Sequence, residues 1–300
     1  LSRAAPSRLL RVAIMGVNSR GIAHIQGWAA QADVEIAWIC DVDRRALQRA
    51  AAQVEKITGR APKTSDDVRR VLEDRELDVL SIATPNHWHA PATIMACAAG
   101  KHVYVEKPGS HNPWEAEMMV KAARHHRRCV QMGNQRRSMR NIIMAIEAVK
   151  SGAIGRVLTA RCYYTRFRPP IGRGKEAPVP EWLNYDLWQG PAPERPYRDN
   201  VIHYNWHWFW HWGNGELGNN GVHTLDLARW ALGLERPLRV TFGGGRYLAD
   251  DDQETPDTGV AAFDCGSVLV TWEQSSSHPR KGESLPLVAF YGEQGRLLLT

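Results

Sequence analysis

A lysine stands directly after a short apolar run in this sequence. Residues 103–105 are Val-Tyr-Val, and Glu106, Lys107 and Pro108 follow at once. Ligands of open α/β sheets bind outside the carboxyl ends of the strands, where such a lysine would lie. It could donate a hydrogen bond to a substrate oxygen and help a proton leave it, so we predict that Lys107 is catalytic and contacts substrate. The alternative is a solvated lysine after an edge strand.

A second stretch, residues 203–226, is dense in aromatic and polar side chains. Indole rings suit the apolar faces of a sugar ring, and His or Asn suits its hydroxyls, so Trp210 and Asn219 are candidate substrate contacts. We expect half of the nearby tryptophans to lie instead in a core or an oligomer face. His203, His207 and His211 are four residues apart. The surrounding glycines and tryptophans disfavour the regular helix that would bring them together, so we predict no metal site.

His223 stands at the start of a predicted helix, residues 222–232, with apolar residues on one face. A histidine has the pKa range of a general base, so we predict that His223 is catalytic and contacts substrate. The alternative is a buried histidine with satisfied hydrogen bonds.

The first elements of the chain can hold a dinucleotide. Residues 9–15 form an apolar strand, and a helix is expected from residue 22 to residue 30. Between them lies a Gly-x-Gly-x-x-Gly loop in which Asn18 replaces the middle glycine. Such a loop places backbone N–H groups against a pyrophosphate. The predicted contacts are Gly16, Val17, Asn18, Ser19, Arg20 and Gly21, and the alternative is an ordinary surface turn.

Asp41 ends the next apolar strand, 25 residues after Gly16. An acid at this spacing hydrogen-bonds the hydroxyls of the adenine ribose and repels a ribose phosphate, which favours NAD. Arg44 and Arg45 lie nearby and could hold that phosphate, so NADP stays open. Alternatively, or in addition, Asp41 caps a helix over residues 44–57 that Gly59 closes.

Strands alternate with helices through residue 133, which predicts a doubly wound parallel sheet. Strands are expected at 78–83, 102–105 and 129–132, with a loop at 84–89 and helices at 91–99 and 113–128. Carboxyl ends of parallel strands meet at one edge. The further candidate cofactor contacts there are Thr84, Asn86, His89, Glu106 and Lys107.

The second half has a different pattern. After a helix at 137–150, a strand is expected at 156–166 and a long loop at 167–196. Further strands at 238–241, 260–263, 267–272, 286–291 and 296–299 predict a mostly antiparallel sheet in an α+β domain. We therefore place a dinucleotide-binding domain at residues 1–133 and a substrate and oligomerisation domain at 134–300.

The composition narrows the function classes. The net charge of +6 comes from 38 basic and 32 acidic residues that are scattered along the chain, which argues against nucleic acid. No apolar run reaches the roughly 18 residues of a membrane span. The five cysteines form no close pairs, and Cys40, Cys97 and Cys129 are expected to be buried free thiols. Residues 1–10 carry neither a hydrophobic signal core nor twin arginines, although a signal could precede Leu1. The compartment stays open between cytoplasm and periplasm.

Three motifs together resemble the Gfo/Idh/MocA family of NAD(P)-dependent oxidoreductases. They are the Thr84-Pro-Asn86-x-x-His89 loop, the stretch from Ala99 to Pro108, and Gly221-x-His223-x-x-Asp226. The resemblance implies a Rossmann domain followed by an α/β domain with an open sheet, often used for dimer or tetramer contacts. It also implies that Lys107 and His223 flank the substrate carbon that exchanges hydride with nicotinamide. The chain departs from the family at two positions. Asn18 replaces a glycine of the loop, and Asn219 replaces the Asp that the family has four residues before the histidine.

The resemblance leads to three hypotheses about function. The first is an NAD(P)-dependent dehydrogenase acting on a secondary alcohol of a sugar, glycoside or cyclitol. The second is a glycoside hydrolase that uses bound NAD for transient oxidation and elimination. The third is a non-catalytic nucleotide-binding protein, which the missing Asp at position 219 suggests. The motif set also resembles a branch of the family often described as exported by the twin-arginine route, and family members usually run past residue 300.

Overall fold

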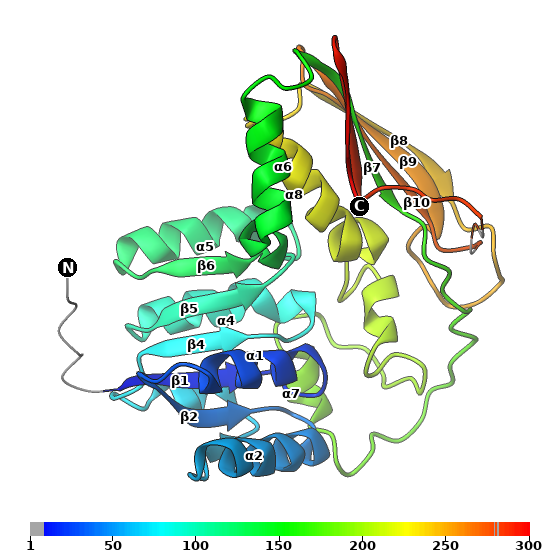
Figure 1. Ribbon diagram of the computed structural model, residues 1–300. Helices are drawn as coiled ribbons and strands as arrows, with labels where there is room; N and C mark the ends of the chain where they lie inside the picture. The colour runs from blue at the N-terminus through cyan, green and yellow to red at the C-terminus, as the bar shows by residue number, and fades with distance from the viewer. Residues whose placement is uncertain (1–8, 279, 281) are drawn as a thin grey trace, which may run out of the picture. The chain divides into compact units, whose positions relative to one another are not determined.

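The computed structural model describes residues 9–278, 280 and 282–300 and divides the chain into two compact units (Figure 1). Unit 1 consists of the residues up to Gly133 together with Lys175–Trp206 and His211–Gly213. Unit 2 consists of Asn134–Gly174, His207–Trp210 and Asn214–Thr300. Two segments that the sequence analysis placed in a continuous second domain therefore belong to unit 1. The predicted absence of a signal in residues 1–10 concerns a stretch that lies mostly outside the described residues.

Unit 1 is built on a six-stranded sheet whose strands are all parallel, in the order β3-β2-β1-β4-β5-β6. Figure 1 shows β2, β1, β4, β5 and β6 stacked in this order. The predicted doubly wound sheet is confirmed. The strands are β1 Leu10–Met15, β2 Val34–Cys40, β3 Lys63–Ser65, β4 Val79–Ile82, β5 His102–Glu106 and β6 Val130–Gly133.

Helices cover both faces of this sheet because the side chains of each strand alternate between two apolar cores. Val12 and Ile14 of β1 pack with Ile25 and Val54 of α1 and α2, whereas Ala13 and Met15 belong to the core of the opposite face. The helices are α1 Arg20–Ala29, α2 Arg44–Thr58, α3 Val68–Leu72, α4 Asn86–Ala98 and α5 Pro113–His125.

Two helix starts differ from the prediction. Asp43, not Asp41, caps α2, since its side chain accepts hydrogen bonds from the N–H groups of Arg45 and Ala46. Helix α4 begins at Asn86, so most of the predicted loop at 84–89 is its first turn. Pro91 therefore lies inside this helix and not at its first position, where the predicted bounds 91–99 placed it. The predicted closure of α2 by Gly59, at φ 71°, is confirmed.

Unit 2 contains a mixed sheet in the order β12-β11-β7-β10-β9-β8. It is antiparallel except for the parallel pair of β7 and β10, so the predicted mostly antiparallel sheet is confirmed. The strands are β7 Val157–Tyr164, β8 Arg239–Gly245, β9 Thr258–Asp264, β10 Leu269–Ser275, β11 Val288–Gly292 and β12 Gly295–Leu299. Its helical elements are η1 Gln135–Ser138, α6 Arg140–Lys150, the π-helical turn η3 Leu217–Gly221 and α8 Val222–Leu232.

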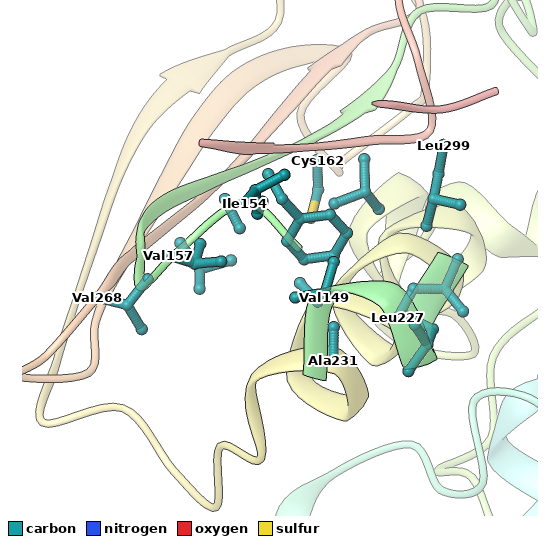
Figure 2. Close-up of a cluster of buried hydrophobic side chains, with 14 of the residues drawn as sticks. Val149, Ile154, Val157, Cys162, Leu227, Ala231, Val268 and Leu299 are labelled. Carbon is teal, nitrogen blue, oxygen red and sulfur yellow. The ribbon is translucent and has the colours of Figure 1, made fainter. Parts of the chain in front are cut away.

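One face of this sheet packs against α6 and α8. Figure 2 shows the apolar core between them, in which Val149 and Leu227 of the helices meet the strand residues Cys162 and Leu299. The helix over 222–232 was predicted with these bounds. This core therefore fixes the start of α8, where His223 lies.

The long connection at 167–196 contains one short helix, α7 Tyr185–Gln189, and Asn205–Trp208 forms the 3₁₀ turn η2. All five cysteines are free. Cys40 and Cys97 are buried as predicted, but Cys129 is exposed, because it lies in the connection between α5 and β6 and not inside the strand. No helix in the described part of the chain is both long and apolar enough to cross a membrane.

Candidate active site

The glycine loop leaves no room for side chains at two positions. A Cβ at Gly16, whose φ is +83°, would lie 2.7 Å from the carbonyl oxygen of Ala83. A Cβ at Gly21 would lie 2.0 Å from the carbonyl oxygen of Gly16. Ser19 stands at the N-cap of α1 without a side-chain hydrogen bond to the helix. Glycine at these two positions therefore allows the tight turn between β1 and α1, and in a sheet of this kind the pyrophosphate binds at that helix start.

Asn18 takes the place of the middle glycine without disturbing this turn. Its side-chain oxygen accepts a hydrogen bond of 3.2 Å from Arg49 Nη2 of α2. The side chain is therefore tied to α2, and Gly16 and Gly21 supply the conformations that the loop needs.

Asp41 lies at the carboxyl end of β2 and is linked to the glycine loop. Its Oδ2 accepts from the Val17 N–H at 2.6 Å, and its Oδ1 accepts from the Asp43 N–H at 2.9 Å. Burial raises the pKa of Asp41, and the two backbone hydrogen bonds oppose this rise. Each carboxylate oxygen has a further lone pair for a ribose hydroxyl. The predicted acid thus lies beside the predicted phosphate loop.

The start of α4 lies at the same edge. The Thr84 hydroxyl is buried and has no hydrogen-bond partner in the protein, which is the kind of group that a bound ligand satisfies. His89 is buried, with Nδ1 2.6 Å from the Pro108 carbonyl oxygen and Nε2 2.9 Å from that of Thr84. Burial lowers the pKa of His89. His89 therefore ties the Thr84 backbone to the residue after Lys107, and Asn86 is buried beside it in the first turn.

Glu106 is the centre of a buried polar network. Its Oε1 accepts from Arg20 Nε at 2.7 Å and lies 3.1 Å from His24 Nε2. Its Oε2 accepts from the Lys107 N–H at 3.3 Å. Although burial raises the pKa of Glu106, the hydrogen bonds from His24 and Arg20 lower it to about 2. The network thus places an ionised carboxylate directly before Lys107.

This network continues to residues that the sequence analysis missed. Trp28 Nε1 donates to Ser81 Oγ at 3.0 Å, and Ser81 Oγ lies 2.9 Å from His24 Nδ1. Since Ser81 accepts from Trp28, its own proton can go to His24, whose Nε2–H then points to Glu106. The available signal was His24 itself, a polar residue in the apolar run of α1.

More tryptophans of the aromatic stretch are buried than the predicted half. Trp206, Trp208 and Trp212 are buried, whereas Trp210 is 55% exposed. The Trp210 N–H donates to Glu254 at 2.7 Å within unit 2. His203 lies 2.9 Å from Asp43 Oδ2, and His211 lies 2.7 Å from the Pro193 carbonyl oxygen. No group of three His, Cys, Asp or Glu residues that could hold a metal occurs among the described residues.

His223 lies in unit 2 in the first turn of α8, directly after the π-helical turn that contains the buried Asn219. Before that turn, the fully buried Glu216 pairs with Arg168 and accepts a hydrogen bond from Asn220. The sequence analysis missed Glu216 and Arg168, which lie 48 residues apart. Asp226 forms a bidentate pair with Arg137 at 2.7 and 2.8 Å. Lys107 lies in unit 1, so its pairing with His223 stays a prediction.

The residues of unit 1 fit a dinucleotide. The tight turn that needs glycine at positions 16 and 21 can take the pyrophosphate at the start of α1, Asp41 can take the ribose, and the buried Thr84 hydroxyl lacks a partner. These three features come from the ends of β1, β2 and β4, and Lys107 follows β5. Four strand ends of one sheet therefore contribute to the candidate site.

Comparison with protein families gives two matches. Residues 10–134 match the Gfo/Idh/MocA domain described as "Oxidoreductase family, NAD-binding Rossmann fold". Residues 170–252 match the C-terminal alpha/beta domain of the same oxidoreductase family. The first match covers the glycine loop, Asp41 and Lys107. Together the two matches cover more than half of the chain.

Among curated proteins, the chain is similar to a glycosyl hydrolase family 109 protein of Shewanella sp. (strain W3-18-1). The two are 32% identical over 161 residues, which is 52% of this chain and 35% of that protein. A family 109 protein of Shewanella baltica (strain OS155 / ATCC BAA-1091) is 31% identical over the same shares. The chain thus spans about a third of the length of these relatives.

Solved structures share the fold at lower identity. The WlbA dehydrogenase from Bordetella pertussis, in complex with NADH and UDP-GlcNAcA, has a TM-score of 0.75 and 22% identity, covering 97% of this chain and 73% of that one. Levoglucosan dehydrogenase, in complex with NADH and levoglucosan, has a TM-score of 0.74 and 21% identity, covering 96% and 72%. At these identities the likeness establishes the fold alone.

Proposed function

Because this chain belongs to the Gfo/Idh/MocA oxidoreductase family, we propose that it transfers hydride between NAD and a secondary alcohol of a sugar, glycoside or cyclitol. The observation that carries this proposal is the convergence of the tight glycine loop, Asp41, the Thr84 hydroxyl and Lys107 at the carboxyl edge of one sheet. The sugar class is further supported by the substrates bound to WlbA and to levoglucosan dehydrogenase.

Lys107 and His223 are the residues to which we assign the chemistry. The nicotinamide, when bound, would supply the hydride acceptor. Lys107 donates a hydrogen bond to the substrate oxygen and stabilises the charge that develops on it. His223 takes the hydroxyl proton as a general base. Trp210 and Asn219 contact the sugar. The proposed cofactor contacts are Gly16, Val17, Asn18, Ser19, Arg20, Gly21, Asp41, Thr84, Asn86, His89, Glu106 and Lys107.

A second candidate function is redox-neutral glycoside cleavage. This candidate is favoured by the family 109 relatives, which are named glycosyl hydrolases. Their similarity extends over about half of this chain. In such a reaction the sugar is oxidised to a ketone, the aglycone is eliminated, water adds to the double bond that this leaves, and the ketone is reduced again, so no NADH accumulates. The second candidate predicts a nucleotide that stays bound through turnover, whereas the first predicts one that exchanges.

Mass spectrometry of the nucleotide released by denaturing the purified protein separates the two candidates. Stoichiometric NAD or NADH supports the redox-neutral reaction, and we would then screen glycosides without added cofactor. An empty protein supports the dehydrogenase, and we would then screen sugars with added NAD and NADP by the absorbance of the reduced nicotinamide. If the protein is empty and reduces neither nucleotide across a broad sugar panel, the proposed function is wrong.

The variant Lys107→Met tests the assignment of the lysine. We expect turnover to fall by roughly 10²–10⁴-fold, the range of a general acid or base, while NAD binding persists. The matched control is Lys121→Met, because Lys121 is exposed on α5 and pairs only loosely with Glu117 at 3.9 Å. A non-catalytic nucleotide-binding protein would bind NAD equally in both variants and would show no turnover to lose.

We also propose a homo-oligomer that uses the sheet face of unit 2 opposite α6 and α8. The exposed apolar residues Val260, Leu269 and Leu298 lie on this face. Their cross-strand partners Glu273, Asp264 and Ala289 alternate along the strands with residues of the core under the two helices, so they face the other way. Light scattering after size-exclusion chromatography distinguishes a monomer from a dimer or tetramer, and Leu269→Lys is expected to weaken the assembly.

A further inference from the structure

A distant segment of unit 1 pairs with the loop that follows β2. The Arg44 N–H donates to the Trp182 carbonyl oxygen at 2.9 Å, and the Asn184 N–H donates to the Val42 carbonyl oxygen at 2.9 Å. Between these bonds, Asp43 and Leu183 form an isolated antiparallel bridge. Residues 182–184 therefore act as a short extra strand along the loop at 42–44, which directly follows Asp41.

This pairing places an aromatic ring against Arg45. The guanidinium carbon of Arg45 lies 3.5 Å from the centroid of the Trp182 ring, which is a close cation–π contact. The same guanidinium reaches the Asp43 carboxylate, with Nε 3.3 Å from Oδ1 and Nη2 3.3 Å from Oδ2. Arg45 is thus held from two sides although half of its side chain is exposed.

Asp43 is itself fixed. It is 1% exposed, it caps α2 through the N–H groups of Arg45 and Ala46, and its Oδ2 lies 2.9 Å from His203 Nε2. The His203 ring lies 5.6 Å from the Trp182 ring. The ion pair that holds Arg45 therefore ends on a carboxylate that cannot follow the arginine if it moves.

The position of Arg45 bears on the choice of nucleotide. In a Rossmann site the acid after the second strand binds the ribose hydroxyls, and a nearby arginine accommodates the 2′-phosphate of NADP. Arg45 lies four residues after Asp41, within that region. To reach a 2′-phosphate, its guanidinium has to leave both Trp182 and Asp43, while Asp41 repels the phosphate.

We propose that Trp182 is a specificity-determining residue, which withholds Arg45 from the 2′-phosphate and so makes the site select NAD over NADP. The inference rests on the proposed function, because it presumes a nicotinamide dinucleotide at this edge. Trp182 acts through Arg45 and needs no contact of its own with the nucleotide. Removing the ring takes away one of the two contacts that hold the arginine, and the pair with Asp43 remains. Without Arg45, loss of the ring has no effect on NADP binding.

The test is equilibrium binding of NAD and NADP, measured by titration calorimetry, so that it does not depend on turnover. For Trp182→Ala we expect the NADP affinity to rise by about tenfold, the middle of the range for a cation–π contact, and the NAD affinity to change by less than about threefold. In Trp182→Ala/Arg45→Met the gain for NADP is expected to disappear. The matched double variant Trp182→Ala/Arg44→Met keeps the gain.

Two further variants keep the test decisive if Trp182→Ala does not fold. Arg45→Met alone, at an exposed position, is expected to leave NADP binding as it is in the wild type, because Arg45 does not contact the phosphate there. Trp182→Phe, which keeps a ring, retains the wild-type preference. If Arg45→Met weakens NADP binding several-fold, the arginine already holds the phosphate and the inference is refuted.

The outcomes separate the inference from the proposed function. A wild-type protein that binds neither nucleotide contradicts both. A wild-type protein that binds NAD, together with a folded Trp182→Ala variant that gains no affinity for NADP, contradicts only the role of Trp182. The role of Trp182 is also contradicted if the gain in NADP affinity survives Arg45→Met or is removed by Arg44→Met. In either case Arg45 is not the residue that binds the phosphate.

Discussion

Replacing Glu106 with Gln removes a charge from a buried network while keeping the size of the side chain. Glu106 is 4% exposed, and it accepts hydrogen bonds from Arg20, His24 and the Lys107 N–H. Its pKa is lowered to about 2 from an ordinary value of 4.5. This difference corresponds to about 3 kcal/mol of stabilisation at neutral pH. We therefore expect Glu106→Gln to lower the free energy of unfolding by about 2–3 kcal/mol at pH 7.

The pH dependence distinguishes this mechanism from a mere packing defect. Because the pKa of Glu106 is lower in the folded protein, the unfolded chain takes up the proton first as the pH falls. The stabilisation is complete well above pH 4.5 and is lost as the pH falls from 4.5 toward 2. At pH 3.5 about 1.4 kcal/mol of it is gone. The difference between wild type and Glu106→Gln should therefore shrink by that amount between pH 6 and pH 3.5.

Urea unfolding followed by circular dichroism at pH 7, 6, 4.5 and 3.5 provides the measurement. Glu293→Gln is the matched control, because Glu293 pairs with Arg156 at 2.9 Å on the surface of unit 2. We expect the control to change the unfolding free energy by less than about 1 kcal/mol. A difference for Glu106→Gln that stays constant from pH 6 to pH 3.5, or that is no larger than that of the control, would refute the reasoning.

Three further predictions concern the loop, the second core and a buried histidine. Gly21→Ala should abolish NAD binding in a titration, because its Cβ would lie 2.0 Å from the Gly16 carbonyl oxygen. The control Gly27→Ala, in the same helix, should leave NAD binding unchanged, because its Cβ would meet no atom within 4 Å. Phe290→Ala should cost about 3–5 kcal/mol of unfolding free energy in urea, since Phe290 is fully buried, and the exposed Met144→Ala should cost less than about 0.5 kcal/mol. Burial lowers the pKa of His87 to about 3 from 6.5. His87 should therefore contribute a loss of about 2 kcal/mol between pH 7.5 and pH 5, and a folded His87→Gln variant should lose about 2 kcal/mol less than the wild type over this range.

The elements that the sequence predicts well are those whose signals are local. The strand before Gly16, the closure of α2 by Gly59 and the helix at 222–232 each follow from periodicity and from residues next to the element. The cap of α2 shows the limit of such signals. Asp41 and Asp43 are two residues apart and both suit an N-cap, so the sequence alone could not choose Asp43.

Contacts between distant segments could not be predicted. Residues 182–184 pair with a loop about 140 residues earlier through backbone groups, and backbone pairing leaves no mark on the side-chain pattern. The ion pair of Arg168 and Glu216 joins side chains 48 residues apart, and 38 basic and 32 acidic residues offer too many possible partners to choose from. Every residue has an N–H or a carbonyl to offer, so only the folded chain shows which ones meet. The single predicted boundary after residue 133 therefore missed the segments that return to unit 1.

One polar network connects the glycine loop with the Glu-Lys-Pro tripeptide. Arg20 of the loop and Glu106 of the tripeptide are 86 residues apart in the sequence. Arg20 of the loop donates to Glu106, and Glu106 accepts from the backbone of Lys107. A buried carboxylate is costly without such partners, so any displacement of Arg20 also disturbs the carboxylate on which the Lys107 N–H rests. The glycine loop and the lysine to which we assign substrate chemistry are therefore coupled through Glu106. In this protein the glutamate of the tripeptide supports the backbone of the lysine that follows it.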